Sequence, residues 1–320
     1  MFSLDKQLVV KSGQASKRWG TYTVQRRKLL NGELVNPDLA MARIAAEDAA
    51  TAAEHVIAEF LKRGDWSVSL KQDDSPVTEV DVAAENSIKN VLLKALPCAA
   101  FYGEETGTAA GIQPQAASRG IDTPAPEPTV SYRWLVDPID GTKSFIRGMP
   151  FYSTQIALEV DGALCVGVSN APAYGERLVA VTGHGVWLNG SEVRCSDVTE
   201  LKDAFLSSGN LGTLAGHRAD WERYAGLVTQ VRRVRGYGDF CHYHQLCCGQ
   251  TDLVVESDVN ILDIAALHVA VHEAGGVMTD LAGAPVDEYT TSILAASTAE
   301  LHQLALNQLG VESVNAAGKT

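Results

Sequence analysis

The sequence predicts a mixed α+β / α/β protein of two layered halves, and three observations support this class. Apolar residues recur at three- and four-residue spacing over residues 39–63, which is typical of an amphipathic helix ending at Gly64. Short β-rich runs at 134–136, 153–160, 163–169 and 177–182, with Asp161-Gly162 as a two-residue turn, predict an antiparallel sheet. From about residue 183 strands alternate with helices, including a strand at 252–257 and a helix at 263–274 closed by Gly275-Gly276.

The 320 residues suffice for two ordinary domains, preceded here by an appendage. Residues 1–38 carry seven Lys or Arg against three acids and show no sustained apolar period, so we expect an N-terminal extension. We expect an α+β domain over 39–185, with a second helix at 80–96 that Pro97 ends, and an α/β domain over 186–320. Residues 106–133, rich in Ala, Gly, Pro and Ser, predict a surface insertion that is either a lid or merely tolerated length.

The charge balance bears on the partners of the protein. Asp and Glu number 39 against 26 Lys and Arg, a net charge of −13, which repels nucleic-acid backbones and anionic lipids. No segment approaches the roughly 20 apolar residues of a membrane span, and the N-terminus has no signal-like apolar region. The six cysteines lack paired Cys-x-x-Cys spacing, which favours reduced, buried thiols. We therefore expect a soluble, cytoplasmic protein without a nucleic-acid or membrane partner.

The segment 134–145 carries the sharpest chemical signal. A short apolar strand runs directly into Asp137 and Asp140, with Pro138 fixing the turn. Carboxylates together with a backbone carbonyl, such as that of Ile139, are ligands that Mg²⁺ prefers. Gly141 and Thr142 can begin a helix, whose free N–H groups would bind a phosphate. Taken alone, the segment could equally be an ordinary turn, because Asp, Pro and Gly are turn residues.

Three further acidic positions strengthen the interpretation. Glu104 and Glu105 follow a predicted strand, although adjacent acids are usually a solvated surface. Asp81 opens a helix as either its cap or a catalytic carboxylate, and Asp263 opens another, where the helix dipole alone favours an acid. The combination in this order is more specific than any single position.

With these motifs, residues 41–309 resemble the inositol monophosphatase superfamily of Mg²⁺-dependent, lithium-sensitive phosphatases. The resemblance rests on residues 103–105, 134–145, 183–190 and 262–276. It implies the layered αβαβα sandwich of the inositol monophosphatase and fructose-1,6-bisphosphatase type, and a homodimer. Residues 75–81, 140–148 and 235–240 look closest to the histidinol-phosphatase branch, so the favoured substrate is L-histidinol phosphate. Inositol 1-phosphate or another cyclitol or sugar phosphate is the alternative, followed by a nucleotide 3′-phosphate and by a non-catalytic metal-dependent binding or regulatory protein.

The resemblance also implies a role for each site residue. Two or three Mg²⁺ ions would occupy the active site, one held by Glu104, Asp137 and the Ile139 carbonyl, a second by Asp137, Asp140 and Asp263. Thr142, supported by Asp81, would with Glu104 orient and deprotonate a metal-bound water. The amides of Gly141 and Thr142 would bind the phosphate of a small phosphorylated metabolite. Asp239 and Glu256 would contact its alcohol portion, pairing with an ammonium or accepting hydroxyls.

Other candidate chemistry is less well supported. His268 and His272 have the spacing of a zinc pair but lack the His-Glu-x-x-His order. Cys241, Cys247 and Cys248 have no evident paired base, and the glycine-rich pieces match neither nucleotide pattern. Two departures from the family concern the pocket: Leu262 precedes Asp263, where many relatives carry an aromatic residue, and Asp258 adds an acid beside Glu256.

Overall fold

A computed structural model describes residues 39–71, 75–111 and 130–311. The predicted extension 1–38 and most of the predicted insertion lie outside these residues. Among the described helices, none combines the length and the apolar character that crossing a membrane requires.

The helices are α1 (Leu39–Arg63), α2 (Glu79–Ala95), α3 (Thr142–Ile146), α4 (Gly212–Gly216), α5 (Arg218–Gln230), α6 (Asp239–Cys247), α7 (Ile261–Glu273) and α8 (Ala299–Gln308), with a 3₁₀ turn at Leu201–Asp203. The strands are β1 (Val68–Leu70), β2 (Pro76–Thr78), β3 (Ala100–Gly103), β4 (Gly107–Ala109), β5 (Tyr132–Asp140), β6 (Ser153–Val160), β7 (Ala163–Ala171), β8 (Glu176–Val181), β9 (Gly185–Leu188), β10 (Ser191–Glu192), β11 (Phe205–Gly209), β12 (Arg233–Arg235), β13 (Leu253–Ser257), β14 (Val277–Thr279) and β15 (Ser292–Ala296).

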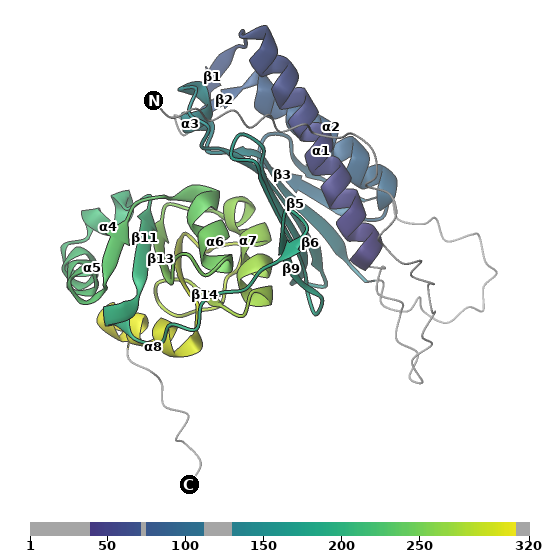
Figure 1. Cartoon of the computed structure of the whole chain (residues 1–320). Coiled ribbons are helices and arrows are strands. Elements are labelled where there is room, and N and C mark those ends of the chain that lie inside the picture. Colours follow the sequence, from purple (N-terminus) through teal and green to yellow (C-terminus); the bar gives the residue numbers. More distant parts are fainter. Residues whose placement is uncertain (1–38, 72–74, 112–129, 312–320) are drawn as a thin grey trace, which may run out of the picture. The chain divides into compact units, whose positions relative to one another are not determined.

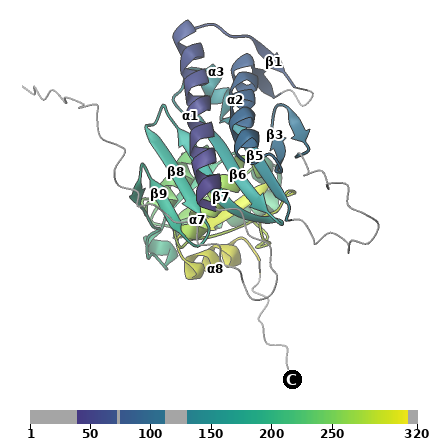
Figure 2. The same cartoon turned by 90° about the vertical axis from the view of Figure 1, so that its right-hand side faces the viewer.

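The elements form five layers, which confirms the predicted αβαβα sandwich. Helices α1 and α2 cover one face of an eight-stranded sheet of order β10-β9-β8-β7-β6-β5-β3-β4 (Figures 1 and 2). Helices α6 and α7 lie between that sheet and a five-stranded sheet of order β12-β11-β13-β15-β14. Helices α5 and α8 complete the outer layer. Both faces of each sheet are thus covered, so apolar side chains on both faces are buried.

Helix α1 has the predicted bounds and packs with a face of small residues. Its buried positions include Ala46, Ala49, Ala50 and Ala53, all fully covered. Small side chains at this spacing let the helix lie close against α2 and the sheet.

Strand β5 is longer than the sequence predicts and corrects the expected turn at residues 137–140. The strand extends from Tyr132 through Asp140, and its register against β6 shifts between Asp137 and Asp140. Pro138, which has no N–H to give to a ladder, is accommodated in this interior strand by the irregularity. The ends of the predicted insertion are also strands, because β4 covers 107–109 and β5 begins at 132.

The antiparallel sheet continues beyond the predicted change of pattern near residue 183. Asp161 and Gly162 both have positive φ, as the predicted two-residue hairpin requires. Asn189 and Gly190 also have positive φ and join β9 to β10, so the sheet extends to Glu192. The division of the chain at residue 185 stays a prediction.

Candidate active site

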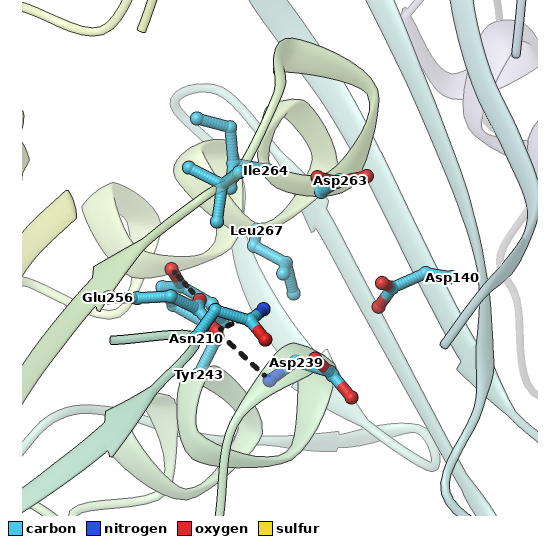
Figure 3. A pocket seen from close by; sticks show the side chains of 9 residues that line it. Asp140, Asn210, Asp239, Tyr243, Glu256, Asp263, Ile264 and Leu267 are labelled. Carbon is cyan, nitrogen blue, oxygen red and sulfur yellow. Dashed lines mark hydrogen bonds between the residues drawn. The ribbon is translucent and has the colours of Figure 1, made fainter. Parts of the chain in front are cut away.

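A pocket opens where the two sheets meet helices α6 and α7. Its lining includes four acids, Asp140 from β5, Asp239 from α6, Glu256 from β13 and Asp263 from α7, and it encloses about 220 Å³ of empty space open to solvent. Figure 3 shows Asp140, Asp239 and Asp263 around the pocket on these separate elements, with the Asp140 carboxyl group directed into it.

Three acids come close enough together to hold a cation. One carboxylate oxygen from each of Asp137, Asp140 and Asp263 lies within 4.8 Å of the other two. Residues three apart on a regular strand point to opposite faces, but the irregularity in β5 brings Asp137 and Asp140 to the same side. The bulged strand therefore makes a site that a regular strand could not.

The acids at this site repel one another and are shielded from water. Burial raises the pKa of Asp137 well above its usual range, and the charges of Glu104, Asp140 and Asp263 raise it further. The pKa of Asp140 is also well above its usual range, because of burial first and then because of the charges of Asp239 and Asp263. Burial also raises the pKa of Asp263 to about 7. A divalent cation would stabilise the ionised carboxylates, and hard oxygen ligands are those of Mg²⁺.

Glu104 is positioned by its backbone and by a buried acid that sequence reasoning missed. The Glu104 N–H donates to the Val136 carbonyl at 3.1 Å, which fixes the residue beside β5. The fully buried Glu85 accepts the N–H groups of Glu105 and Thr106 at 2.8 and 2.7 Å. A Cβ at Gly103 would lie 2.4 Å from the Glu85 carboxyl carbon, so this position needs glycine. The helical pattern offered a signal, because Glu85 lies three residues before Ile88 and seven before Leu92, on the apolar face of α2.

Lys71 is a second site residue that sequence reasoning missed, and the sequence pattern does not single it out. Its Nζ donates to Glu104 Oε1 and to Glu105 Oε1, both at 2.8 Å. Burial opposes the charge on Lys71, but the two carboxylates prevail and raise its pKa. Burial, partly offset by Lys71, raises the pKa of Glu105 to about 7. Glu104 and Glu105 thus share a cationic partner.

Thr142 and Asp81 meet as the sequence predicts. The Thr142 hydroxyl lies 3.2 Å from Asp81 Oδ1 and 2.9 Å from the Ile139 carbonyl, and both oxygens are acceptors. The cap of α2 is Thr78, and Asp81 is the third helical residue, which completes the capping box by accepting the Thr78 N–H. Asp81 thus supports the cap and also contacts Thr142. Burial raises the pKa of Asp81, and hydrogen bonds from Thr78 and Thr142 lower it. The two readings left open by the sequence are therefore compatible.

The turn into α3 depends on glycine. Gly141 has φ +89, and a Cβ there would lie 2.8 Å from the Phe151 carbonyl oxygen. The first amides of a helix have no intrahelical acceptor, so those at the start of α3 remain available to a ligand. Asp137 Oδ1 accepts the Ile139 N–H at 2.9 Å, which orients this carboxylate at the same turn.

Asp263 lies in the first turn of α7, which begins two residues before the predicted start. Asn260 caps the helix, and Asp263 accepts the Asn260 backbone N–H at 2.8 Å and its side-chain amide at 3.0 Å. The capping box orients the carboxylate while leaving lone pairs on both oxygens.

The opposite end of the pocket is organised around Glu256. His242 Nε2 and the Tyr243 hydroxyl lie 3.0 and 2.8 Å from Glu256 Oε2. The Asp239 N–H donates to Glu256 Oε1 at 3.3 Å. Burial, followed by the charge of Glu256, raises the pKa of Asp239 to about 6, which His242 and Asn210 partly offset. Sequence reasoning missed His242, since a histidine inside an apolar helix resembles a core residue.

Close backbone packing brings these groups together. A Cβ at Gly209 would lie 2.5 Å from Glu256 Oε1 and 2.7 Å from the Gly238 Cα.

The two histidines considered as a zinc pair lie outside the acid cluster. The rings of His268 and His272 are 4.3 Å apart, and burial lowers the pKa of His268 to about 4.

Comparison with known proteins assigns the family. The model of the inositol monophosphatase family matches residues 38–312. The histidinol-phosphatase of Streptomyces coelicolor is 35% identical, over 85% of this chain and 96% of that protein. The histidinol-phosphatase of Mycobacterium tuberculosis is 37% identical, over 68% of this chain and 79% of that protein. The crystal structure of the extragenic suppressor protein suhB from Bartonella henselae superposes with a TM-score of 0.71 at 28% identity, covering 84% of this chain and 98% of that one. The chain belongs to the inositol monophosphatase family and is a phosphoric monoester hydrolase.

Proposed function

We propose that the protein is a Mg²⁺-dependent phosphatase that hydrolyses L-histidinol phosphate to L-histidinol and phosphate. The observation that carries the choice of substrate is the pair Asp239 and Glu256 at the end of the pocket away from Asp137. Burial and mutual repulsion leave Asp239 with a pKa of about 6, so a cation beside it would be stabilised. The ammonium of an amino alcohol is such a cation, whereas a cyclitol offers only hydroxyls. The histidinol-phosphatase relatives support the same choice.

The donor set fits Mg²⁺. Asp137, Asp140 and Asp263, with Glu104 and the Ile139 carbonyl, would hold two or three ions. When bound, Mg²⁺ lowers the pKa of a water and neutralises charge on the phosphoryl group.

The residues of the chain would then position the reactants. The amides of Gly141 and Thr142 bind the phosphate oxygens at the start of α3. Thr142 donates its hydroxyl proton to Asp81 as it accepts a proton from the attacking water, with Glu104 orienting that water. The new P–O bond forms as the ester P–O bond breaks, and the departing alcohol takes a proton from solvent. Asp239 and Glu256 hold the ammonium and fix the orientation of the ester.

A substrate panel tests the proposal. Phosphate release is measured with Mg²⁺, and again with EDTA, from histidinol phosphate, inositol 1-phosphate, adenosine 3′,5′-bisphosphate and fructose 1,6-bisphosphate. We expect Mg²⁺-dependent turnover with the highest kcat/KM on histidinol phosphate. Preference for inositol 1-phosphate would retain the metal site and refute the choice of substrate. Inactivity on all four would favour a binding or regulatory protein.

Asp239→Asn sharpens this test. The variant removes the charge that faces the ammonium and keeps Asp137, Asp140 and Asp263, although it also removes one charge that raises the pKa of Asp140. We expect kcat/KM on histidinol phosphate to fall about tenfold to a hundredfold, as for loss of a buried charge pair, with little change on inositol 1-phosphate. An equal loss on both substrates would mean that Asp239 acts on the site and not on the ammonium.

Two remaining expectations are independent of this chemistry. We infer a homodimer and a cytoplasmic location, and both stay predictions. Light scattering of the purified chain would test the first, and fractionation of the source cells the second.

A further inference from the structure

A chain of polar side chains extends away from Asp140 through the interior. Asp140 Oδ2 accepts from Ser153 Oγ at 3.1 Å. Gln155 Nε2 donates to Ser153 Oγ at 2.8 Å and to Ser169 Oγ at 3.1 Å. Ser169 Oγ lies 2.8 Å from His244 Nε2, and His244 Nδ1 lies 2.8 Å from Glu176 Oε2. The chain thus ends at a half-buried acid on β8, far from the candidate metal site in sequence.

The register of the large sheet accounts for this path. Asp140 faces Ser153 across β5 and β6, and Gln155 faces Ser169 across β6 and β7. His244 comes from α6, which packs over this face. The Gln155–Ser153 contact lies within β6, and the other contacts join neighbouring strands or a strand and helix α6. A one-residue slip of β6 would turn Ser153 and Gln155 to the other face of the sheet and break the chain.

Burial makes these contacts obligatory. Gln155 is fully buried, Ser153 and Ser169 are 1% and 2% exposed, and His244 is 2% exposed. Buried polar groups without partners destabilise the fold, so each member is held by the next. Gln155 Oε1 is buried without a hydrogen-bond partner among the described residues, which is a cost that a leucine or methionine would avoid. The chain thus retains a half-satisfied amide inside the large sheet.

If both serine hydroxyls donate a hydrogen bond, only one assignment of donors and acceptors fits these contacts. Ser153 accepts from Gln155 and donates to Asp140, and Ser169 accepts from Gln155 and donates to His244 Nε2. His244 Nδ1 then carries the proton and donates to Glu176. Burial lowers the pKa of His244, in agreement with a neutral ring. The orientation of Asp140 is therefore connected through four side chains to Glu176.

We propose that Ser153, Gln155, Ser169 and His244 are positioning residues that hold the Asp140 carboxylate in the orientation needed for binding the metal. The inference rests on the proposed function in one respect, that Asp140 is a metal ligand. Groups that orient a ligand from behind commonly change metal affinity about tenfold to a hundredfold when removed. The hydroxyl of Ser153 acts directly on Asp140, and the other three act through it.

The test is a double-mutant cycle on metal binding without substrate. Gln155→Met removes the central amide at similar volume, and His244→Phe removes the far end without touching Asp140. Binding of Mn²⁺, a paramagnetic probe of an Mg²⁺ site, is measured by electron paramagnetic resonance for both single variants and the double variant. We expect each single variant to bind Mn²⁺ about tenfold more weakly, and the double variant to be no weaker than the worse single variant.

Controls separate this outcome from general damage. Asn170→Ser cuts a different buried network, on the adjacent residue of β7, where Asn170 contacts Glu54 and Arg177, and should leave the affinity unchanged. If Gln155→Met or His244→Phe fails to fold, Ser169→Ala removes one oxygen from the same chain and takes its place in the cycle. The ¹⁵N shifts of His244 should report a neutral ring protonated at Nδ1 in the wild type.

The outcomes distinguish the inference from the proposed function. Failure of the wild type to bind Mn²⁺, or binding that Asp137→Asn leaves unchanged, would overturn the proposed metal site. Wild-type binding that Gln155→Met and His244→Phe do not weaken would overturn the positioning chain alone. Fully additive losses in the double variant would also overturn it, because residues in one chain must be coupled.

Discussion

At the scale of the residue, Asp137 is the centre of the candidate metal site. It is 2% exposed, and its carboxylate lies among Asp140, Asp263 and Glu104. A buried carboxylate of this kind destabilises the folded protein when it is ionised without a counter-charge. A cation bound beside it removes this cost. We therefore expect a bound cation to stabilise the charge of Asp137 together with those of its neighbours.

Asp137→Asn should abolish most of the turnover. The substitution removes a charge shared by the proposed ions and keeps the size of the side chain, so kcat should fall more than about a hundredfold, beyond the usual cost of a supporting residue, with the fold intact. Phosphate release at saturating Mg²⁺ and the circular dichroism spectrum measure the two effects. Asp203→Asn removes one charge from an exposed residue and is the matched control. Its rate of phosphate release should equal that of the wild type. A folded Asp137→Asn protein with near-normal turnover would refute the site.

Glu85→Gln tests a residue that sequence reasoning missed. Both Glu85 carboxylate oxygens accept backbone N–H groups, from Glu105 and Thr106, and an amide can replace only one of these acceptors. The loop that carries Glu104 should loosen, and the affinity for Mg²⁺ measured by calorimetry should fall about tenfold. Unchanged affinity in a folded variant would show that β5 and Lys71 hold Glu104 without help from Glu85.

At the scale of the element, the close approach of α7 to β7 connects the two sheets. A Cβ at Gly167 would lie 2.3 Å from the Ala266 carbonyl oxygen of α7, so only glycine fits. Helix α7 carries Asp263, and β7 carries Ser169, so this contact also keeps parts of the site in register. The packing of α7 against β7 thus affects both the stability of the fold and the geometry of the candidate site.

Gly167→Ala should destabilise the protein by about 1–3 kcal/mol, the usual cost of overpacking. Urea denaturation followed by circular dichroism measures the change. Gly226→Ala is the control, because Gly226 lies within α5 and a Cβ added there would have nothing within 4 Å. That variant should gain about 0.5–1 kcal/mol from helix propensity. Equal effects at the two glycines would mean that the contact with Ala266 is easily relaxed.

At the scale of the whole molecule, the pocket is a concentration of negative charge in a protein whose net charge is already −13. Burial raises the pKa of Asp263 and of Glu105 to about 7 and that of Asp239 to about 6. Ordinary carboxyl groups titrate near a pKa of about 4, so the folded protein holds these protons in a range where the unfolded chain has lost them. These three protonated carboxyl groups therefore stabilise the folded state fully below about pH 4. This stabilisation is lost as the pH rises through about 6 to 7.

Mg²⁺ should therefore stabilise the protein more at pH 8 than at pH 5. The ionised carboxylates repel one another at the higher pH, and binding a cation only to the folded state raises its stability. The change in Tm between EDTA and excess Mg²⁺ at the two pH values measures this. Asp263→Asn should reduce the difference, since it removes one of the titrating ligands. A larger increase in Tm at pH 5 would contradict the assigned direction.

The sequence by itself determined the family, the layered α/β class, and the elements whose signals are local. The helix at 39–63, the Asp161-Gly162 turn and the acids in the stretch 134–145 depend on periodicity and residue type, which neighbours in the chain supply. Only the tertiary structure decided how these acids meet. The irregularity in β5 that brings Asp137 and Asp140 to one face, the support from Glu85 and Lys71, and the path from Asp140 to His244 depend on register and on contacts between distant segments. A carboxylate or an imidazole looks the same in the sequence whether it faces solvent or a buried partner, and only packing distinguishes the two.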